Sequence, residues 1–448
     1  MDNIYAVIFV NNDIEQGMAT VESIRAFNDI EGLSVIVVDN TNGARLSGWA
    51  KQQQDITYVY MDGKPHKFSE LYNSIISELN IDGDMLLIDE GMAITPNCLK
   101  SMKLTLDSDD HIGAVGGVSN GFAGKQNRAD LNSYEKTIDS ALSYSGEGAK
   151  KRSLNLDASA ILWKKETIKT LGEMDEKIDD KRTAMFDYCI RAILANWKLV
   201  INPECLWWDI QLGHRLEGQY LQVDKLEKKW GMHYFNWTPN YSLVDMIDKE
   251  KWEEFSVLEV GCDCGATLLE IENSFPNAKA YGSELNPNAV KVAMHVANVV
   301  VDNIENQNLL FPGETFNYII FGDVLEHLRD PQATVDYCRT LLKDNGCIIA
   351  CIPNLMHVSV MRELLNGRFE YTEMGLLDRT HVHFFTYYEI INMFQKAGYE
   401  VEIVSSRGVA LSEADNAFIE NLLALSTATE KFMYETFQYI IRARIKDK

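Results

Sequence analysis

The sequence predicts an α/β fold arranged in two domains, and three observations point to it. The chain has 448 residues, which is more than one hydrophobic core ordinarily organises. Short apolar runs alternate with segments of helical spacing in both halves, a pattern typical of parallel sheets covered by helices. Several of these runs end in acidic or glycine-rich turns, which is where open α/β sheets hold their ligands.

The N-terminal half begins with this alternation. Strands are expected over residues 4–10, 33–38 and 84–88, and helices over residues 17–27 and 68–79. Asp39 directly follows the second strand, and Asp89 and Glu90 follow the third. Because the carboxyl ends of parallel strands meet at one edge of a sheet, we expect these carboxylates to lie close together.

Three segments of this half are informative about its family. They are Val37-Val38-Asp39-Asn40, Leu86-Leu87-Ile88-Asp89-Glu90-Gly91 and Phe186-Asp187-Tyr188-Cys189-Ile190-Arg191. With them, residues 1–210 resemble the GT-A fold of family-2 glycosyltransferases. The resemblance implies that Asp39, Asp89 and Asp187 contact a nucleotide sugar and that Asp89 binds Mn²⁺ or Mg²⁺.

This half also departs from the pattern of that family. Gly91 stands where the metal-binding Asp-x-Asp pattern normally ends in Asp. Ala184 and Met185 occupy the place of the acidic pair that supplies the base. These departures favour an impaired or divergent transferase that holds a nucleotide sugar or glycan, or that only supports its neighbour. An active transferase stays open as the alternative.

The second half contains a glycine-spaced loop between a strand and a helix. Val257-Leu258-Glu259-Val260 predicts a buried strand, Gly261-Cys262-Asp263-Cys264-Gly265 the loop, and residues 266–271 a helix. Glycines let the backbone approach a ligand, and the helix N-terminus offers unpaired N–H donors. A later strand over residues 280–284 ends in Glu284, which is placed to accept ribose hydroxyls. Many Rossmann-like nucleotide-binding domains share this spacing.

Three further segments narrow the choice. They are Asp323-Val324-Leu325-Glu326-His327-Leu328, Ile352-Pro353-Asn354 and Leu377-Asp378-Arg379-Thr380-His381-Val382-His383-Phe384-Phe385-Thr386. With the loop, they make residues 236–405 resemble a Rossmann-like class I methyltransferase that depends on S-adenosylmethionine (SAM). The cofactor-binding residues that the resemblance implies are Glu259, Gly261, Asp263, Gly265, Glu284, Leu285, Asn303, Ile304, Asp323 and Val324.

The resemblance also implies individual roles within the cofactor pocket. Glu284 would hold the ribose hydroxyls, with capping of the following helix as its alternative role. Leu285 would pack on the adenine. Asn303 stands where the family often places Asp beside the adenine amine, and Asp263 stands where many members carry glycine, so both are departures.

The acceptor side of the predicted pocket contains two histidines and an arginine. His327 or His381 is a candidate general base, since a neutral imidazole can deprotonate an alcohol near neutral pH, and the alternative is that each is structural. Arg379 would pair an anionic group of the acceptor, or else form a salt bridge with Asp378 or Glu373. The Asn/Asp-Pro-Pro-aromatic signature of nucleobase and glutamine methylation is absent. A sugar or small-molecule hydroxyl is therefore the expected acceptor.

Composition limits the partners and the compartment. The net charge is −24, with 66 acidic and 42 basic residues, so nucleic acid is not an expected partner. No apolar stretch is long enough for a membrane span, and residues 1–10 lack the basic segment of a signal peptide. The 8 cysteines are scattered, as expected for reduced core residues in a cytoplasmic protein.

The predicted domains are a GT-A-like domain over residues 1–212, an aromatic helical linker over 213–240, a methyltransferase domain over 241–405 and a helical extension over 406–448. The leading hypothesis is a SAM-dependent O-methyltransferase acting on a sugar, glycan or small molecule. Its glycosyltransferase-like domain suggests modification of a surface, flagellin or S-layer glycan. The alternatives are a bifunctional enzyme that uses a nucleotide sugar and a metal, and a non-catalytic glycan-binding assembly protein.

Overall fold

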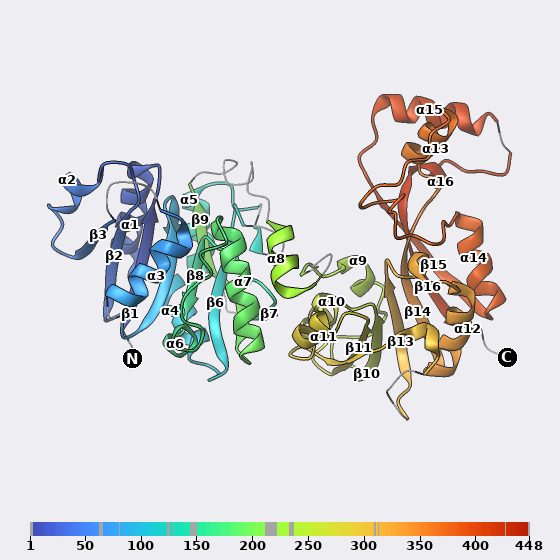
Figure 1. Ribbon diagram of the computed structural model, residues 1–448, viewed down its shortest axis with the longest axis horizontal. Helices are drawn as coiled ribbons and strands as arrows, with labels where there is room; N and C mark the ends of the chain where they lie inside the picture. Colours follow the sequence, from blue (N-terminus) through green and yellow to red (C-terminus); the bar gives the residue numbers. More distant parts are fainter. Residues whose placement is uncertain are drawn as a thin grey trace. The chain divides into compact units, whose positions relative to one another are not determined.

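The computed structural model describes residues 3–61, 66–79, 81–122, 126–128, 130–143, 150–210, 222–232, 237–308, 311, 313–425 and 427–446. The chain forms two compact units, Met1–Trp237 and Thr238–Lys448. Each unit is built on its own β-sheet (Figure 1). Among the described helices, none combines the length and the apolar character needed to span a bilayer.

The sheet of the N-terminal unit begins with four parallel strands in the order β3-β2-β1-β4. Their bounds are Ile4–Val10 for β1, Leu33–Asp39 for β2, Ile56–Tyr60 for β3 and Asp84–Asp89 for β4. The sheet continues through β8 (Ala160–Trp163), β6 (Ile112–Ser119), β9 (Lys198–Asp209) and β5 (Met92–Ile94), and β7 (Lys151–Ser153) pairs with β9. The three strands expected from the sequence are confirmed, because β1, β2 and β4 cover them.

Helices cover both faces of this sheet. On one face, Val21 and Ile24 of α1 (Ile14–Phe27) and Leu99 and Met102 of α4 (Cys98–Leu106) form the main core with the strands. On the other face, α7 (Lys181–Leu194) packs against α3 (Phe68–Glu78) and α6 (Lys165–Leu171). The remaining helices are α2 (Ser47–Ala50), α5 (Tyr134–Ser143) and α8 (Val223–Trp230). The two helices expected from the sequence correspond to α1 and α3.

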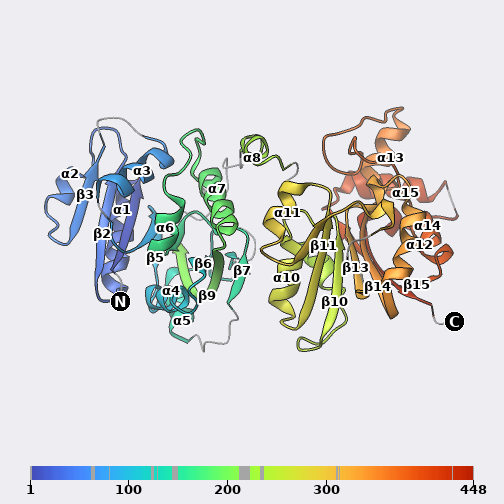
Figure 2. The same cartoon turned by 60° about the horizontal axis from the view of Figure 1, so that its bottom comes forward.

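The sheet of the C-terminal unit has the order β12-β11-β10-β13-β14-β16-β15. The bounds are Phe255–Val260 for β10, Ala278–Glu284 for β11, Asn298–Val301 for β12, Phe316–Gly322 for β13, Leu342–Pro353 for β14, Tyr399–Gly408 for β15 and Thr436–Ile445 for β16. The strands from β12 to β14 are parallel, and β10, β11, β13 and β14 can be followed side by side in Figure 2. Strand β16 runs antiparallel between β14 and β15. From β10, the chain adds β11 and β12 on one side of the sheet and then β13 and β14 on the other. This reversal of the strand order confirms the Rossmann-like prediction.

The helices of this unit pack on the sheet or connect its strands. The bounds are Tyr241–Val244 for α9, Ala266–Ser274 for α10, Pro287–Ala293 for α11, Pro331–Leu341 for α12, Val358–Leu365 for α13, Tyr387–Lys396 for α14, Glu413–Leu423 for α15 and Phe432–Glu435 for α16. Helices α12 and α14 touch each other, and Val335 and Phe394 from them lie in one core with Leu258 and Ile319 of the strands. Two short 3₁₀ helices, η2 (Ile304–Asn306) and η3 (Leu325–His327), follow strands β12 and β13.

The C-terminal segment corrects one prediction. The sequence pattern predicts helix throughout residues 406–448, and α15 and α16 are helical, but Thr436–Ile445 forms strand β16. Tyr439, Ile441 and Ala443 of β16 alternate into the core of the sheet. Pairing with β14 and β15 is long-range and outweighs the local helical pattern.

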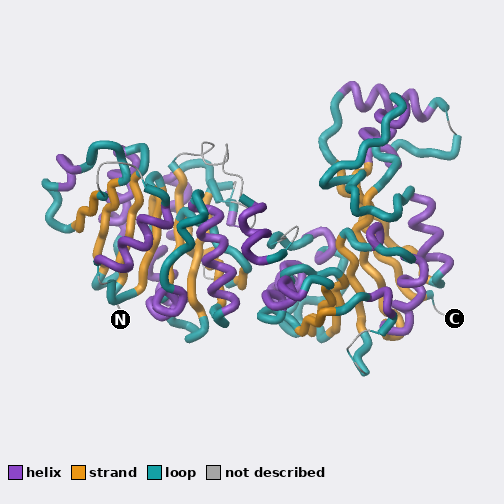
Figure 3. The backbone as a smooth tube through the Cα atoms, viewed as in Figure 1, coloured by secondary structure: helices purple, strands orange, loops and turns teal. Residues whose placement is uncertain are grey.

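Helices α13, α15 and α16 form a small lobe, here called the cap. Its own core contains Val358, Ile419, Leu422 and Tyr434. Since β14 and β15 end beside the start of β16, the cap lies at the carboxyl edge of the sheet, beyond the strand ends (Figure 3). The Asn354 amide donates to the carbonyls of Met433 (2.8 Å) and Thr436 (2.7 Å) and fastens the cap to the end of β14.

The predicted linker over residues 213–240 is described in part. Its residues 213–221 and 233–236 lie outside the described residues. The described part includes α8, which packs against α7 of the N-terminal unit. This segment is therefore ordered against its own unit over the residues of α8.

Candidate functional site

The loop after β10 has the backbone that its glycines predict. Gly261 and Gly265 have φ angles of 70° and 82°, and Asp263 between them has a φ angle of 46°. A Cβ atom on Gly261 would lie 2.7 Å from Cγ2 of Val324. The loop after β10 and Val324, two residues after β13, are therefore in close contact at the carboxyl edge of the sheet. Helix α10 begins at Ala266.

Glu284 at the end of β11 ties this loop to its neighbour. Its two carboxylate oxygens accept hydrogen bonds from the backbone N–H groups of Asp263 (3.1 Å) and Asn286 (2.8 Å). The helix-capping role considered for Glu284 belongs to Asn286, whose side chain accepts from the N–H of Asn288 at the start of α11. Leu285 stands beside Glu284 and is 65% exposed, so it offers an apolar surface at this edge.

Glu259 within β10 is a buried acid. One carboxylate oxygen, Oε2, has no hydrogen-bond partner among the described residues. Burial is the main reason that the pKa of Glu259 is raised, to about 8. A hydrogen bond with Thr267 lowers this pKa, whereas the charges of Asp263 and Glu284 raise it. A buried unpaired carboxyl oxygen is costly, so this position suits a ligand with a positive or hydrogen-donating group.

This raised pKa predicts a dependence of stability on pH. The folded state keeps the proton of Glu259 up to about pH 8, whereas the unfolded carboxyl releases it near its ordinary pKa of 4.5. Stability therefore falls as pH rises between these values. Buried Asp323 and Glu326, whose pKa values are also raised by burial, act in the same direction. Without SAM, we expect Glu259 to cost the C-terminal unit about 2 kcal/mol of unfolding free energy between pH 6.5 and 8.

Calorimetric unfolding of the full chain at these two pH values measures the effect, with the C-terminal transition identified by its response to SAM. His357 and His381, whose pKa values burial lowers from the ordinary 6.5, act in the opposite direction, and starting at pH 6.5 leaves out most of their contribution. In Glu259→Gln the slope should be visibly smaller. A stability in wild type that is unchanged over this window would contradict the prediction.

The predicted cofactor residues Asn303 and Ile304 follow the end of β12, and their contacts with SAM stay predictions. The Asn303 side chain accepts a hydrogen bond from the N–H of Glu305 (3.0 Å) as the cap of η2, and Ile304 is buried in the core. Asp302 precedes it, and its Oδ2 is buried without a hydrogen-bond partner among the described residues. Burial raises the pKa of Asp302. The sequence analysis did not single out Asp302, although its position directly after a strand was the available signal.

Asp323 follows β13 in the left-handed region, with a φ angle of 57°. The Gln438 amide of β16 donates to its Oδ1, and burial raises the pKa of Asp323. The predicted cofactor residues Asp323 and Val324 thus lie at the same edge as the glycine-spaced loop. Their contacts with SAM stay predictions.

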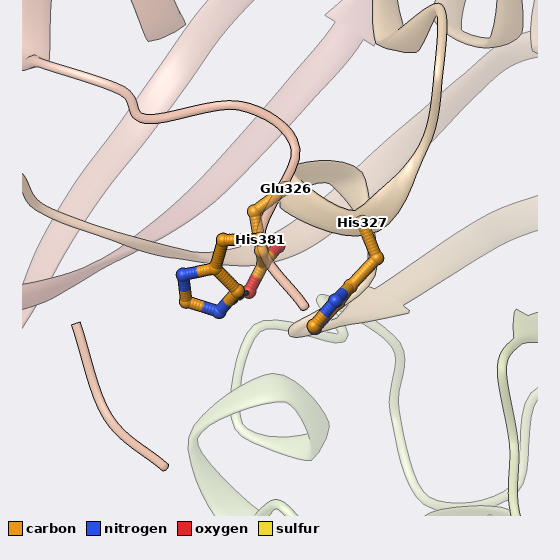
Figure 4. Close-up of side chains that lie close together, drawn as sticks. All are labelled: Glu326, His327 and His381. Carbon is orange, nitrogen blue, oxygen red and sulfur yellow. Dashed lines mark ion pairs between the residues drawn. The ribbon is translucent and has the colours of Figure 1, made fainter. Parts of the chain in front are cut away.

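Next to them, Glu326 and His327 of η3 meet His381 (Figure 4). One ligand atom of each of these three side chains lies within 4.8 Å of the others. The rings of His327 and His381 are 4.9 Å apart between centroids. The backbone carbonyl of Glu326 accepts from the N–H groups of Val382 (2.8 Å) and His383 (3.0 Å), which holds the segment with His381 against η3.

Hydrogen bonds fix the orientation of both rings. Nδ1 of His327 lies 3.2 Å from the carbonyl oxygen of Thr380, and Nδ1 of His381 lies 3.3 Å from that of Leu376. Since a carbonyl only accepts, each Nδ1 is the donor in its bond, and each Nε2 is the ring nitrogen left for another partner. Burial, and then the charge of His327, lowers the pKa of His381, which keeps that ring neutral. The sequence analysis named both histidines and missed the carboxylate of Glu326 between them.

Arg379 points to a surface partner. Its guanidinium lies 2.5 Å from Oε1 of Glu373, and the two side chains are 56% and 75% exposed. This is the salt bridge that the sequence analysis kept as the alternative role. Near His381, the rings of Phe369, Tyr371 and Phe384 pack edge to face with centroid distances of 5.5 and 5.6 Å from Phe369. These three rings are called the aromatic shelf below.

In the N-terminal unit, the carboxylate of Asp39 is fully committed to the protein. Asp39 is buried, and it accepts hydrogen bonds from the N–H groups of Thr41 (3.0 Å) and Leu46 (2.9 Å) and from the Tyr58 hydroxyl (2.8 Å). Its predicted contact with a nucleotide sugar stays a prediction. These hydrogen bonds are enough to explain why Asp39 is buried, because they give its carboxylate a structural role.

Asp89, the predicted metal ligand, is paired with a cation of the chain. The ammonium of Lys181 at the start of α7 forms an ion pair with Asp89, and it lies 4.8 Å from the ring centroid of Phe68. The neighbouring Glu90 accepts from the backbone N–H groups of Asn11 and Asn12. A lysine thus supplies positive charge where Mn²⁺ or Mg²⁺ was expected.

Asp187 is held by helix α8. Its carboxylate accepts from Nε1 of Trp230 (2.9 Å) and from Nζ of Lys229 (3.0 Å), and its side chain is 1% exposed. Its predicted contact with a nucleotide sugar stays a prediction, and the observed bonds anchor α8 to α7. Within the described ranges, three side chains whose grouping could hold a metal ion are found at Glu326, His327 and His381 of the C-terminal unit.

Residues 212–404 match a family model described as a methyltransferase domain. The chain therefore contains a SAM-dependent methyltransferase domain. It is 29% identical over 154 residues to a ubiquinone biosynthesis O-methyltransferase of Cereibacter sphaeroides, covering 33% of this chain and 61% of that protein. The methyltransferase therefore spans about three fifths of that relative.

Two further similarities complete the comparison. The methyltransferase is 25% identical over 218 residues to uncharacterized protein MJ1252 of Methanocaldococcus jannaschii, covering 45% of this chain and 83% of that protein. A mannosyltransferase of Pyrobaculum calidifontis, solved with GDP-Man and Mn²⁺, is similar with 12% identity and a TM-score of 0.36 over 48% of this chain and 59% of that chain. This likeness is too low to assign the N-terminal unit a fold family.

Proposed function

We propose that the C-terminal unit transfers the methyl group of SAM to a hydroxyl oxygen of a small molecule or glycan. The observation that carries the proposal is the pair of imidazoles of His327 and His381, whose Nδ1 atoms bond backbone carbonyls and whose Nε2 atoms are left for a ligand. His327 is three residues from Val324, which touches the glycine-spaced loop. An acceptor oxygen at the Nε2 atoms would therefore lie close to a methyl donor held at that loop.

The residues at this edge fit SAM. When bound, SAM supplies a methyl group on a positively charged sulfur. The edge collects carboxyl groups, and two of them, Glu259 and Asp302, have a buried oxygen without a hydrogen-bond partner among the described residues. Such oxygens suit the ammonium and the adenine amine of SAM. Glu284 is placed for the ribose hydroxyls, and exposed Leu285 is placed for the adenine face.

The side of the pocket that contains His327 and His381 indicates the chemical class of the methyl acceptor. An oxygen acceptor must lose a proton, and a neutral imidazole or a bound cation can assist that loss. The aromatic shelf near His381 offers ring faces and edges for a sugar or an aromatic ring, with Phe369 41% and Tyr371 52% exposed. The curated relatives named as O-methyltransferases support oxygen as the acceptor atom.

The glycan setting rests on the resemblance of the N-terminal half to glycosyltransferases. The pairing of Lys181 with Asp89 supports a unit that does not transfer sugar through Mn²⁺ or Mg²⁺. Such a unit can still hold a nucleotide sugar or a glycan for the methyltransferase. The bifunctional alternative requires a divalent metal at Asp89, in competition with this lysine.

Isothermal titration of the full chain tests both parts of the proposal. We expect micromolar binding of SAM and no heat from UDP-, GDP- or dTDP-sugars with Mn²⁺. Formation of S-adenosylhomocysteine with hydroxyl-bearing sugars and glycans then tests the acceptor class. The absence of SAM binding would overturn the cofactor assignment. Binding of a nucleotide sugar that depends on Mn²⁺ and is lost in Asp89→Ala would favour the bifunctional enzyme.

A further inference from the structure

We propose that Glu326, His327 and His381 bind one divalent transition-metal ion at the acceptor side of the pocket. The starting observation is their grouping, since one ligand atom of each lies within 4.8 Å of the others. The three side chains come from η3 and from the segment before α14, which the Glu326 carbonyl joins through two backbone hydrogen bonds. The backbone thus holds the group together without help from the side chains.

The hydrogen bonds of the histidines prepare both rings as ligands. Metal-binding histidines commonly donate their second ring N–H to a carbonyl or carboxylate, which fixes the ring and the free nitrogen. His327 and His381 do this through Nδ1 toward the carbonyls of Thr380 and Leu376. Nε2 of His381 lies 4.0 Å from Oε1 of Glu326, a separation that an ion between the two atoms can bridge.

The carboxylate of Glu326 gives an independent reason for a cation. Its side chain is 1% exposed, and Oε2 has no hydrogen-bond partner among the described residues. The nearest histidine is at 4.0 Å from Oε1, too far for a hydrogen bond. A buried carboxylate in this condition is unfavourable by itself and becomes favourable when it coordinates a metal ion.

The donor set selects the class of ion. Two imidazole nitrogens and one carboxylate oxygen suit Zn²⁺, Fe²⁺, Co²⁺ or Mn²⁺, whereas Ca²⁺ and Mg²⁺ prefer oxygen donors throughout. Three protein ligands leave at least one coordination position open. His327 is exposed while Glu326 is buried, so the open position faces the solvent side of the cluster.

The catalytic use of the ion rests on the proposed function. In that role the acceptor hydroxyl binds the open position, where the positive charge lowers its pKa and the proton leaves to water. The acceptor oxygen then forms a bond to the methyl carbon of SAM, the carbon–sulfur bond breaks, and its electron pair stays on sulfur. His327 and His381 are ligands in this account, and neither takes the proton.

Metal binding is tested directly on the full chain after treatment with a chelator. Titration with Zn²⁺ in the calorimeter should show one site, and Co²⁺ should give a visible absorption that Zn²⁺ removes. Glu326→Gln, His327→Ala and His381→Ala should each weaken the affinity roughly 10-fold or more. The matched control is His383→Ala, because His383 lies on the same segment but its ring bonds the carbonyl of Arg329 (3.1 Å).

Titration of the same variants with SAM separates this proposal from the proposed function. SAM binding retained in His327→Ala and His381→Ala shows that these variants are folded. Zn²⁺ affinity unchanged in all three cluster variants, or lost equally in His383→Ala, would overturn the metal site and leave the methyltransferase intact. Absence of SAM binding in wild type would instead overturn the cofactor assignment. If Zn²⁺ binds but methyl transfer is insensitive to the chelator, the catalytic use of the ion is wrong.

Discussion

Replacing Gly261 with valine is expected to weaken SAM binding about 100-fold or more, which corresponds to about 2.7 kcal/mol. Two effects act together. Gly261 has a φ of 70°, which a β-branched residue adopts only with strain. Its Cβ atom would also lie 2.7 Å from Cγ2 of Val324. The loop after β10 must therefore move away from Val324, and the proposed SAM pocket lies between them.

Gly313→Val is the matched control for this change. Gly313 has a similar φ of 79°, but a Cβ atom there would meet no atom within 4 Å. Both variants carry the backbone strain, and only Gly261→Val carries the collision. Titration with SAM, together with thermal unfolding of each protein, separates lost binding from lost stability. Normal SAM affinity in Gly261→Val would show that this loop is not the cofactor site.

Local sequence signals predicted which strands carry the candidate cofactor residues. The loop at Gly261 and the acid at Glu284 were each predicted from an apolar run that ends in a turn, and both occupy strand ends of one edge. Parallel strands bring such positions together whatever lies between them in the sequence. The same reasoning placed His327 near the pocket before any partner of its ring was known.

Burial and long-range pairing could not be predicted in this way. Glu326 stands beside His327 in the sequence, but its unpaired buried oxygen becomes visible only when the segment of His381 folds over η3. The sequence also does not show that the Asp302 side chain has a buried oxygen without a hydrogen-bond partner among the described residues, whereas the Asn303 side chain caps η2. Lys181 and Asp89 form an ion pair although they are 92 residues apart in the sequence, and local sequence patterns do not predict contacts at such a separation.

Strand β16 shows the same limit for the fold. The sequence predicts helix through this segment, which contains Arg442 and Arg444. In the sheet, these two arginines reach Glu402 of β15 and Asp248 on one side of the strand. The segment is a strand because β14 and β15 are available to pair with it. An isolated strand has no hydrogen-bond partners, whatever the spacing of its apolar residues.

Replacing Glu284 with glutamine should lower SAM affinity by roughly 30- to 100-fold, because two charge-assisted hydrogen bonds to ribose hydroxyls become weaker. Glutamine keeps the size of the side chain but turns an NH₂ group toward the backbone donors of Asp263 or Asn286. A loss of affinity could thus arise from the ribose or from the loop. Glu305→Gln is the control, because Glu305 also accepts two backbone N–H groups, those of Arg329 (2.8 Å) and Asp330 (3.2 Å).

A ligand without the hydroxyls separates the two causes. Wild type and Glu284→Gln are titrated with S-adenosylhomocysteine and with its 2′,3′-dideoxy analogue, and the four affinities form a double-mutant cycle. If Glu284 holds the ribose, the variant and the wild type bind the dideoxy analogue about equally, and the variant loses affinity only for the complete nucleoside. An equal loss for both ligands would assign Glu284 to the loop alone. The ribose role follows from the cycle and not from the size of the loss, because the carboxylate already stabilises the loop by itself.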